Sequence, residues 1–142
     1  MRKPHSTTAI KRVTRRNRRG AAAVEFALVV PVVFLLFFAA LEFTRVAMIR
    51  HTADNAVYEG CRVGIIPGAT SDEVRQTATD IMATLGVTNV TVDVQPGNID
   101  RDTDEVTVSI DIPLDANAYV PNQFVAGKTV TRRLTLRREG IR

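Results

Sequence analysis

The sequence has few of the residues that build disulfides, metal sites and base-stacking surfaces. Of its 142 residues, one is cysteine, two are histidine and none is tryptophan. A single cysteine excludes an intrachain disulfide, so cysteine pairing does not indicate the redox compartment. We expect Cys61 to be a small buried apolar residue, with intermolecular pairing as the alternative.

Acidic residues are absent from the N-terminal segment. Eight of the nineteen basic residues and none of the fifteen acidic residues lie in residues 1–20. The segment also lacks an aromatic residue that could stack on a base and a helical period that would enter a groove. We therefore predict no nucleic-acid partner, and we expect residues 1–19 to be disordered.

One long apolar run follows this basic segment. Residues 21–41 are all apolar or small except Glu25 and Pro31. At about 1.5 Å per residue, a helix of this length spans roughly 30 Å, the thickness of the hydrocarbon core of a bilayer. The run predicts one transmembrane helix, and the basic residues before it predict a cytoplasmic N-terminus with residues 43–142 outside.

Two other readings of the run are disfavoured. A secretory signal needs a small residue two positions before the last residue of its cleavage site, but Phe37 and Phe38 precede Ala39 and Ala40 at that spacing. A twin-arginine leader is disfavoured because no apolar pair follows Arg15 and Arg16.

Glu25 is the anomaly of the apolar run. A charged side chain at depth in a membrane costs about 2.5 to 3.5 kcal/mol on insertion scales, so an intramembrane glutamate is expected to be functional and to have a partner. Pro31 removes one backbone donor and is expected to kink or loosen the helix.

Beyond the run, the helical period continues over residues 42–66, and Pro67 with Gly68 predicts its end. We expect an amphipathic extension whose polar face carries Arg45, Arg50, Asp54 and Glu59. A second, short helix is predicted after it. Thr70 and Glu73 have the spacing of a capping box, and Gly86 is a C-terminal stop.

The period then changes to two residues, which predicts strands. Residues 90–94 and 106–112 alternate apolar and polar side chains and are expected to form an antiparallel hairpin with a long turn. Residues 129–137 predict a third strand with Val130, Leu134 and Leu136 inward, although Arg132 breaks the alternation. The fold class is therefore α+β, with a long N-terminal helix that is half transmembrane and half amphipathic, a short helix and a small antiparallel sheet of two to three strands. The predicted parts are a basic cytoplasmic leader (1–20), the membrane span (21–41), the helix extension (42–66) and a small extracytoplasmic domain (67–142).

No catalytic set or cofactor site is predicted. Asp100, Asp102 and Asp104 resemble the start of a calcium loop, but Glu105 stands where the loop needs glycine. A solvated turn is the favoured interpretation. His5 and His51 are expected on opposite sides of the membrane, so they predict no metal site. We expect no enzymatic activity.

The region from residue 15 to residue 66 resembles the TadE-like minor pilins, or pseudopilins, of the tight-adherence (Flp) type IV pilus system. The resemblance rests on a basic segment ending in Gly20, followed by Glu25-Phe26-Ala27-Leu28, Pro31, Glu42-Phe43 and Glu59-Gly60. Cys61, where alanine is expected, and Asn55-Ala56-Val57-Tyr58 depart from the family pattern, so TadE, its partner TadF and uncharacterised relatives all remain open.

The resemblance implies cleavage by a membrane prepilin peptidase between Gly20 and Ala21, at a processing site that includes Glu25 and Phe26. It also implies a single-pass protein of the bacterial inner membrane, with a periplasmic or extracellular C-terminal domain. Its partners would be the peptidase, membrane lipid and other pilins and pseudopilins in an oligomeric assembly, with Glu25 and Pro31 as assembly residues.

Cleavage would also supply the partner that Glu25 lacks. It creates a free ammonium at Ala21, which can neutralise Glu25 of a neighbouring subunit, and a paired charge costs less than a lone one in low dielectric. The alternative function is that of an ordinary single-pass anchored protein whose outer domain binds a ligand or the cell wall. In that case Glu25 would reach the lipid headgroups instead of being buried.

Overall fold

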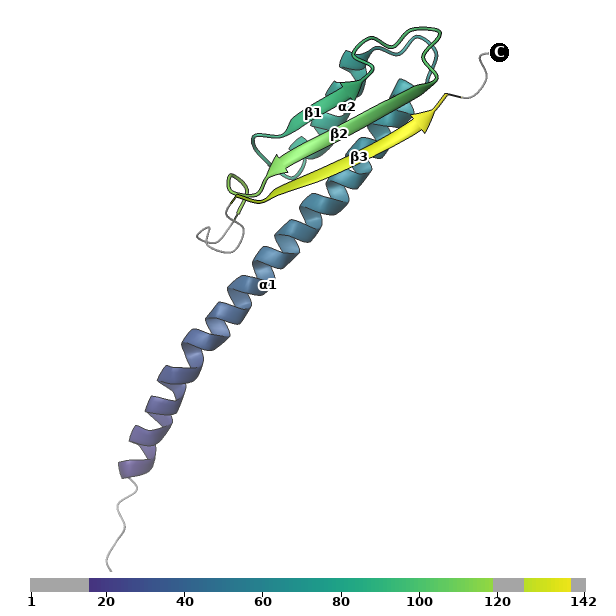
Figure 1. The fold of residues 1–142 in the computed structure, drawn as a ribbon. Coiled ribbons are helices and arrows are strands. Elements are labelled where there is room, and N and C mark those ends of the chain that lie inside the picture. Colours follow the sequence, from purple (N-terminus) through teal and green to yellow (C-terminus); the bar gives the residue numbers. More distant parts are fainter. Residues whose placement is uncertain (1–15, 119–126, 139–142) are drawn as a thin grey trace, which may run out of the picture. The chain divides into compact units, whose positions relative to one another are not determined.

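The computed structural model describes residues 16–118 and 127–138, with side chains from residue 20 onward. In chain order the elements are α1 (Arg16–Gly64), α2 (Ser71–Ala83), β1 (Thr91–Gln95), β2 (Glu105–Pro113) and β3 (Thr129–Arg137), as Figure 1 shows. The three strands form one sheet in the order β1-β2-β3. This confirms the α+β class with one long helix, one short helix and a small antiparallel sheet.

The chain divides into two units, residues 1–37 and 38–142. In its described part, the first unit consists of the N-terminal portion of α1. The second unit contains the remainder of α1, together with α2 and the sheet.

The ends of α1 differ from the prediction. The helix begins at Arg16, so residues 16–19 are helical and the expectation of disorder is wrong for them. The same expectation for residues 1–15 lies outside the described residues. At the other end, α1 stops at Gly64 and a turn leads to Gly68, whose φ of +89° favours glycine. Pro31 does not interrupt the helix, since it lies inside α1.

The capping box at the start of α2 is present as predicted. The backbone N–H of Glu73 donates to Thr70 Oγ1 at 3.3 Å, and the N–H of Thr70 donates to Glu73 Oε2 at 2.9 Å. The two bonds satisfy backbone donors that the first turn of a helix leaves free. The face of α2 that carries Val74, Ala78 and Met82 is buried.

The sheet is antiparallel throughout, and β2 is its central strand. Val94 of β1 lies opposite Val108 of β2, which lies opposite Leu134 of β3. One face of the sheet is covered, because the β2 side chains that point to it are buried: Val106, Val108, Ile110 and Ile112. The alternating residues on the other face are polar, as the period of two predicted.

Both helices cover the buried face of the sheet. Ile49, Ala53, Ala56 and Cys61 of α1 are fully buried in the same apolar cluster as Val74 of α2 and the β2 valines. At Gly64, α1 approaches β2 and α2 closely, because a Cβ placed there would lie 2.8 Å from Val106 Cγ1 and 3.1 Å from Val74 Cγ2. One turn earlier, at Gly60, a Cβ would lie 3.5 Å from Ala78 Cβ and from the carbonyl oxygen of Val74, which are ordinary contact distances.

Arg45 corrects the predicted polar face of α1. It is buried instead of solvated, and its Nη1 donates to the carbonyl oxygen of Leu85 at 3.1 Å. Leu85 follows the end of α2, where carbonyl groups lack partners within the helix. The arginine therefore stabilises the polar end of one helix from within the other.

Arg132 breaks the strand pattern because it also has a partner on α1. It lies on the same face of β3 as Val130 and Leu134, and its Nε is 2.8 Å from Asp54 Oδ1. The predicted third strand with Val130, Leu134 and Leu136 facing the core is confirmed, with Val130 buried and both leucines packed against the core.

Candidate processing and assembly site

The N-terminal part of α1 presents an uncovered apolar surface. An 18-residue window of this helix reaches a mean hydropathy of 2.7, and none of it is buried. Phe26 and Leu28, for example, are each 70% exposed. This is one helix that is long and apolar enough to cross a membrane by length and composition. Apolar surface of this extent requires lipid or another protein to cover it.

Gly20 lies at the start of this surface. A Cβ placed on Gly20 would meet no atom within 4 Å, and Gly20 is not among the residues with positive φ. Neither packing nor backbone conformation within the described chain therefore requires glycine. Glycine inside a helix costs about 0.5 to 1 kcal/mol relative to alanine, so its presence here is a cost without an internal benefit.

Ala21 and Glu25 lie one turn apart on the same face of α1. Glu25 is exposed, and it makes no ion pair or side-chain hydrogen bond with any other residue in the part of the chain that the structure describes. Phe26 follows it and is also exposed. The carboxylate thus stands within an apolar surface with no partner from its own described chain.

Pro31 lies in the same helix, six residues beyond Glu25. Its ring nitrogen has no hydrogen to donate to the carbonyl of Ala27, four residues earlier. In a bilayer such a carbonyl must find another partner or remain unsatisfied. Processing and assembly residues predicted from the sequence therefore all fall on one stretch of α1, from Gly20 to Pro31.

Comparison with known families agrees with the predicted resemblance. Residues 20–62 match the family model of TadE-like proteins. The chain is TadE-like over this segment. The match begins at Gly20 and runs almost to the end of α1, whereas α2 and the sheet lie beyond it. No curated protein and no solved structure matched the chain.

The TadE-like segment and the apolar helix together fit a pilus-associated, membrane-anchored protein. TadE-like proteins are structural components of the Tad/Flp pilus system, and the similarity over residues 20–62 suggests interaction with other pilus components. It follows that the exposed residues of the helix are candidates for contacts with other chains.

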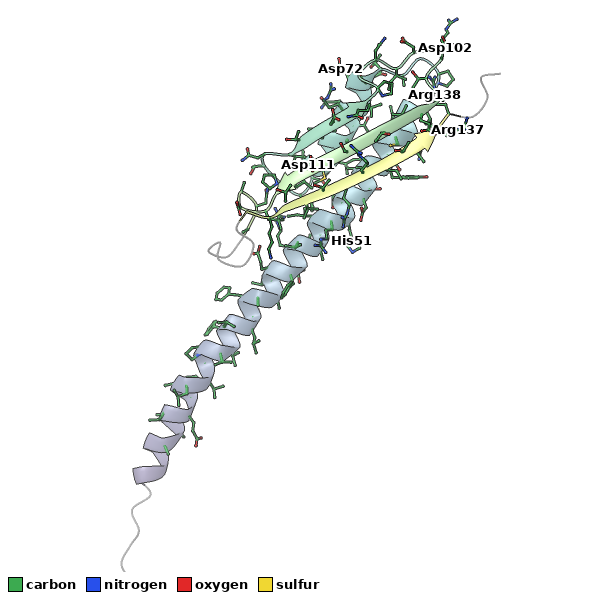
Figure 2. The ribbon with its side chains drawn as sticks, in the orientation of Figure 1. His51, Asp72, Asp102, Asp111, Arg137 and Arg138 are labelled. Carbon is green, nitrogen blue, oxygen red and sulfur yellow. The ribbon has the colours of Figure 1, made fainter. Side chains whose placement is uncertain are left out.

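The acidic turn at residues 100–105 is held by hydrogen bonds to Arg138. Arg138 Nη1 donates to the carbonyl oxygen of Asp100 at 2.6 Å, and the Arg138 N–H donates to that of Asp104 at 2.7 Å. Figure 2 shows Arg138 and Asp102 at the same end of the molecule's sheet. Within the described ranges, no group of three or more histidine, cysteine, aspartate or glutamate side chains could hold a metal ion.

Cys61 is a free, fully buried thiol, as predicted. Its Sγ lies 3.2 Å from the carbonyl oxygen of Leu134 and 3.7 Å from that of Val106. Burial raises the pKa of the Cys61 thiol, and backbone hydrogen bonds at Val108 and Leu136 oppose this shift. The residue fills space between α1 and the sheet and is poorly placed to react.

Three buried polar residues were missed by sequence reasoning. Arg45 shares the apolar stripe of α1, four residues before Ile49 and eight before Ala53, and that spacing could have identified it. Asn117 donates from Nδ2 to the carbonyl oxygens of Thr88 and Pro113, and no periodic signal marks it. Arg138 follows the last strand and likewise carries no signal.

Proposed function

We propose that this protein is a TadE-like pseudopilin, a structural or assembly component of a tight-adherence (Flp) pilus, which a prepilin peptidase matures by cutting between Gly20 and Ala21. The proposal is supported by two residues, Gly20 and Glu25, whose identities no contact within the described chain explains. Gly20 has no internal reason to be glycine, and Glu25 has no partner within its own described chain. A cut between Gly20 and Ala21 gives both residues a role.

The helical context of the cut is compatible with proteolysis. Gly20 is the fifth residue of α1, so the bond to Ala21 lies within its first two turns. The ends of helices fray at low cost, and glycine lowers the cost further. A peptidase that binds an extended chain would therefore need to open only the first turns, and a side chain larger than hydrogen at position 20 would obstruct it.

Maturation would change the charge of the site. The uncut chain has a neutral amide at Ala21, while the mature chain has an ammonium that can pair with Glu25 of a neighbouring copy. The two groups are four residues apart along one helix, which corresponds to about 6 Å. Copies displaced by about one helical turn along the membrane normal would bring the ammonium of one next to the carboxylate of the other.

The proposed topology follows from the charge of the leader. Eight basic residues precede the span and favour a cytoplasmic N-terminus, in the inner membrane of a bacterium. Residues 43–142 would then lie in the periplasm or outside the cell. A reporter that works only after export from the cytoplasm should be active when fused to the C-terminus. A reporter that works only in the cytoplasm should be inactive at the same position.

The experiment that tests maturation is Gly20→Val in the full-length chain. Because a β-branched residue should block entry to the peptidase, we expect the precursor to accumulate in the membrane at its full length. Ala22→Val is the matched control, since it adds the same side chain two residues beyond the cut and should still be processed. If Gly20→Val loses its first twenty residues as wild type does, the proposed peptidase is not the enzyme that acts. A wild-type chain that stays uncut at Gly20 would instead favour a simple membrane anchor with a ligand- or wall-binding outer domain.

A further inference from the structure

The second unit carries opposite charges on its two sides. β3 contains three arginines and no acidic residue. At the other edge of the sheet, α2 and β1 together contain four acidic residues and one basic residue: Asp72, Glu73, Asp80 and Asp93, with Arg75. The strand order β1-β2-β3 makes β1 and β3 opposite edges, and α2 packs against β1.

The charges on the β3 side are available to a partner. Arg132 is committed to Asp54, but Arg133 and Arg137 are exposed and form no ion pair with any residue of the described ranges. The backbone edge of β3 is also unpaired in the described sheet. Its inward-pointing Arg132 and outward arginines are of the kind that discourages addition of another strand. Contacts at this edge are therefore expected to use side chains.

The charges on the opposite side are equally accessible. Asp80 near the end of α2 and Asp93 on the outer face of β1 are both exposed, and they accept hydrogen bonds from the neutral side chains of Gln76 and Gln95. Figure 2 shows Asp72 at the start of α2 and Arg137 at the end of β3. Neither Asp80 nor Asp93 forms an ion pair with a basic residue in the described part of the chain.

Strand β3 runs alongside the part of α1 that belongs to the second unit. Asp54 contacts Arg132 and, two helical turns later, Cys61 contacts Leu134, so α1 and β3 advance in the same direction. Because the two edges carry opposite charges, the β3 edge of one copy is electrostatically complementary to the β1 edge of another copy.

We propose that the β3 side of one copy docks on the α2 and β1 side of the next copy, through Arg133 and Arg137 on one surface and Asp80 and Asp93 on the other. The proposal rests on the proposed function, because it requires several copies in one membrane assembly. The contact is heterologous, so repetition produces a row, ring or helical filament instead of a closed pair. Exposed ion pairs are individually weak, and the contact would therefore act together with association of the helical spans.

Cysteine cross-linking between two tagged full-length copies in the membrane tests the contact. One copy carries Thr135→Cys on β3 and the other Thr79→Cys on α2, which are neutral exposed positions on the two surfaces. A short bismaleimide should join the two copies. A chain with neither added cysteine is the control for Cys61, and Thr135→Cys paired with Thr135→Cys is the control for random collision, which should give much less product.

Charge reversal identifies the residues responsible. Arg133→Glu with Arg137→Glu in the first copy should lower the yield of cross-linked product about tenfold, because like charges would then face each other. Asp80→Lys with Asp93→Lys in the second copy should lower it similarly against a wild-type β3. Combining both reversed copies should restore the yield, and recovery of this kind excludes misfolding as the cause of the loss.

Three results would overturn the proposal: no cross-linking of the unreversed pair, a yield that is unchanged by reversal, or a loss that the compensating reversal does not restore. The last result would indicate that β3 binds an anionic lipid headgroup or a different protein. Cleavage after Gly20 is measured in the same cells and keeps the two hypotheses distinct. Processed protein without this cross-link contradicts the contact alone, whereas unprocessed protein contradicts the proposed function.

Discussion

Arg132 of β3 and Asp54 of α1 form an ion pair that joins the edge of the sheet to the long helix, with Arg132 Nε 2.8 Å from Asp54 Oδ1. The Arg132 side chain is 34% exposed and that of Asp54 is 56% exposed. The pair is thus a boundary contact, which explains why an arginine can occupy the core-facing side of an edge strand.

We predict a small coupling between these two residues. Because both are partly exposed, a double-mutant cycle with Asp54→Asn and Arg132→Met should give about 0.2 to 1 kcal/mol. Arg132→Met alone should be well tolerated, since a methionine continues the apolar row of Val130 and Leu134. Thermal unfolding of the full-length protein in detergent measures the cycle. A coupling of several kcal/mol would show that the pair is more buried than the structure indicates.

The close approach of α1 to β2 predicts opposite results for two glycines. Gly64→Ala should destabilise the protein by about 1 to 3 kcal/mol, because the new methyl group would lie 2.8 Å from Val106 Cγ1. Gly60→Ala is the control in the same helix, where the contacts would be 3.5 Å or more. It should be neutral or stabilising by up to about 1 kcal/mol, since alanine favours a helix. Equal effects of the two substitutions in thermal unfolding would contradict the described packing.

Burial of Cys61 predicts a slow thiol reaction and a specific pH dependence. A maleimide should label the folded protein much more slowly than the denatured protein at neutral pH. Because the pKa of Cys61 is raised in the folded state, the stability due to the buried neutral thiol is present below the pKa of the unfolded thiol, about 8.5, and is lost as pH rises through the higher folded value.

Cys61→Ala removes this group from the titration. The stability of wild type relative to Cys61→Ala should therefore be constant at neutral pH and fall above about pH 9. Melting temperatures of both proteins over this range measure the difference. Rapid labelling of the folded protein, or a difference that does not change with pH, would contradict the buried position of the thiol.

Glu25 is expected to affect assembly without affecting insertion. Glu25→Val removes a charge that is costly in lipid, so the protein should enter the membrane at least as well as wild type. The same variant should be processed after Gly20 but should fail to join pili or pilus-like complexes, because the Ala21 ammonium of a neighbour loses its partner.

Glu25→Gln is the matched variant, since it keeps the shape and removes only the charge. We expect its assembly defect to resemble that of Glu25→Val. Membrane level, processing and incorporation into complexes are measured together for both. Normal assembly with valine at position 25 would leave the glutamate without the proposed role and would favour a carboxylate that reaches only water and headgroups.

The local patterns in the sequence were sufficient to predict the helices, the strands and much of the buried core. The capping box at Thr70 and Glu73 and the alternation around Val108 each depend on neighbours within one element, and the structure has both. Arg45 and Arg132 were harder, because their partners Leu85 and Asp54 are distant in sequence. A polar residue on an apolar face indicates that a polar partner exists, but the local sequence does not show which residue that partner is.

The candidate site was predictable for a different reason. Gly20 and Glu25 stand out because nothing in a single helix explains them, and the described structure supplies no contact that does. The residues that hold the second unit together at its loops, Asn117 and Arg138, could not be found in this way. Their role is to bond backbone groups of turns, and those positions are fixed only once the sheet has formed.

If the chain functions as a processed pilus subunit, the protein recovered from the membranes of cells that carry the pilus system has lost its leader. N-terminal sequencing of that protein should find Ala21 as the first residue, with residues 1–20 removed. A protein that retains the leader, or that begins at any residue other than Ala21, would contradict this account.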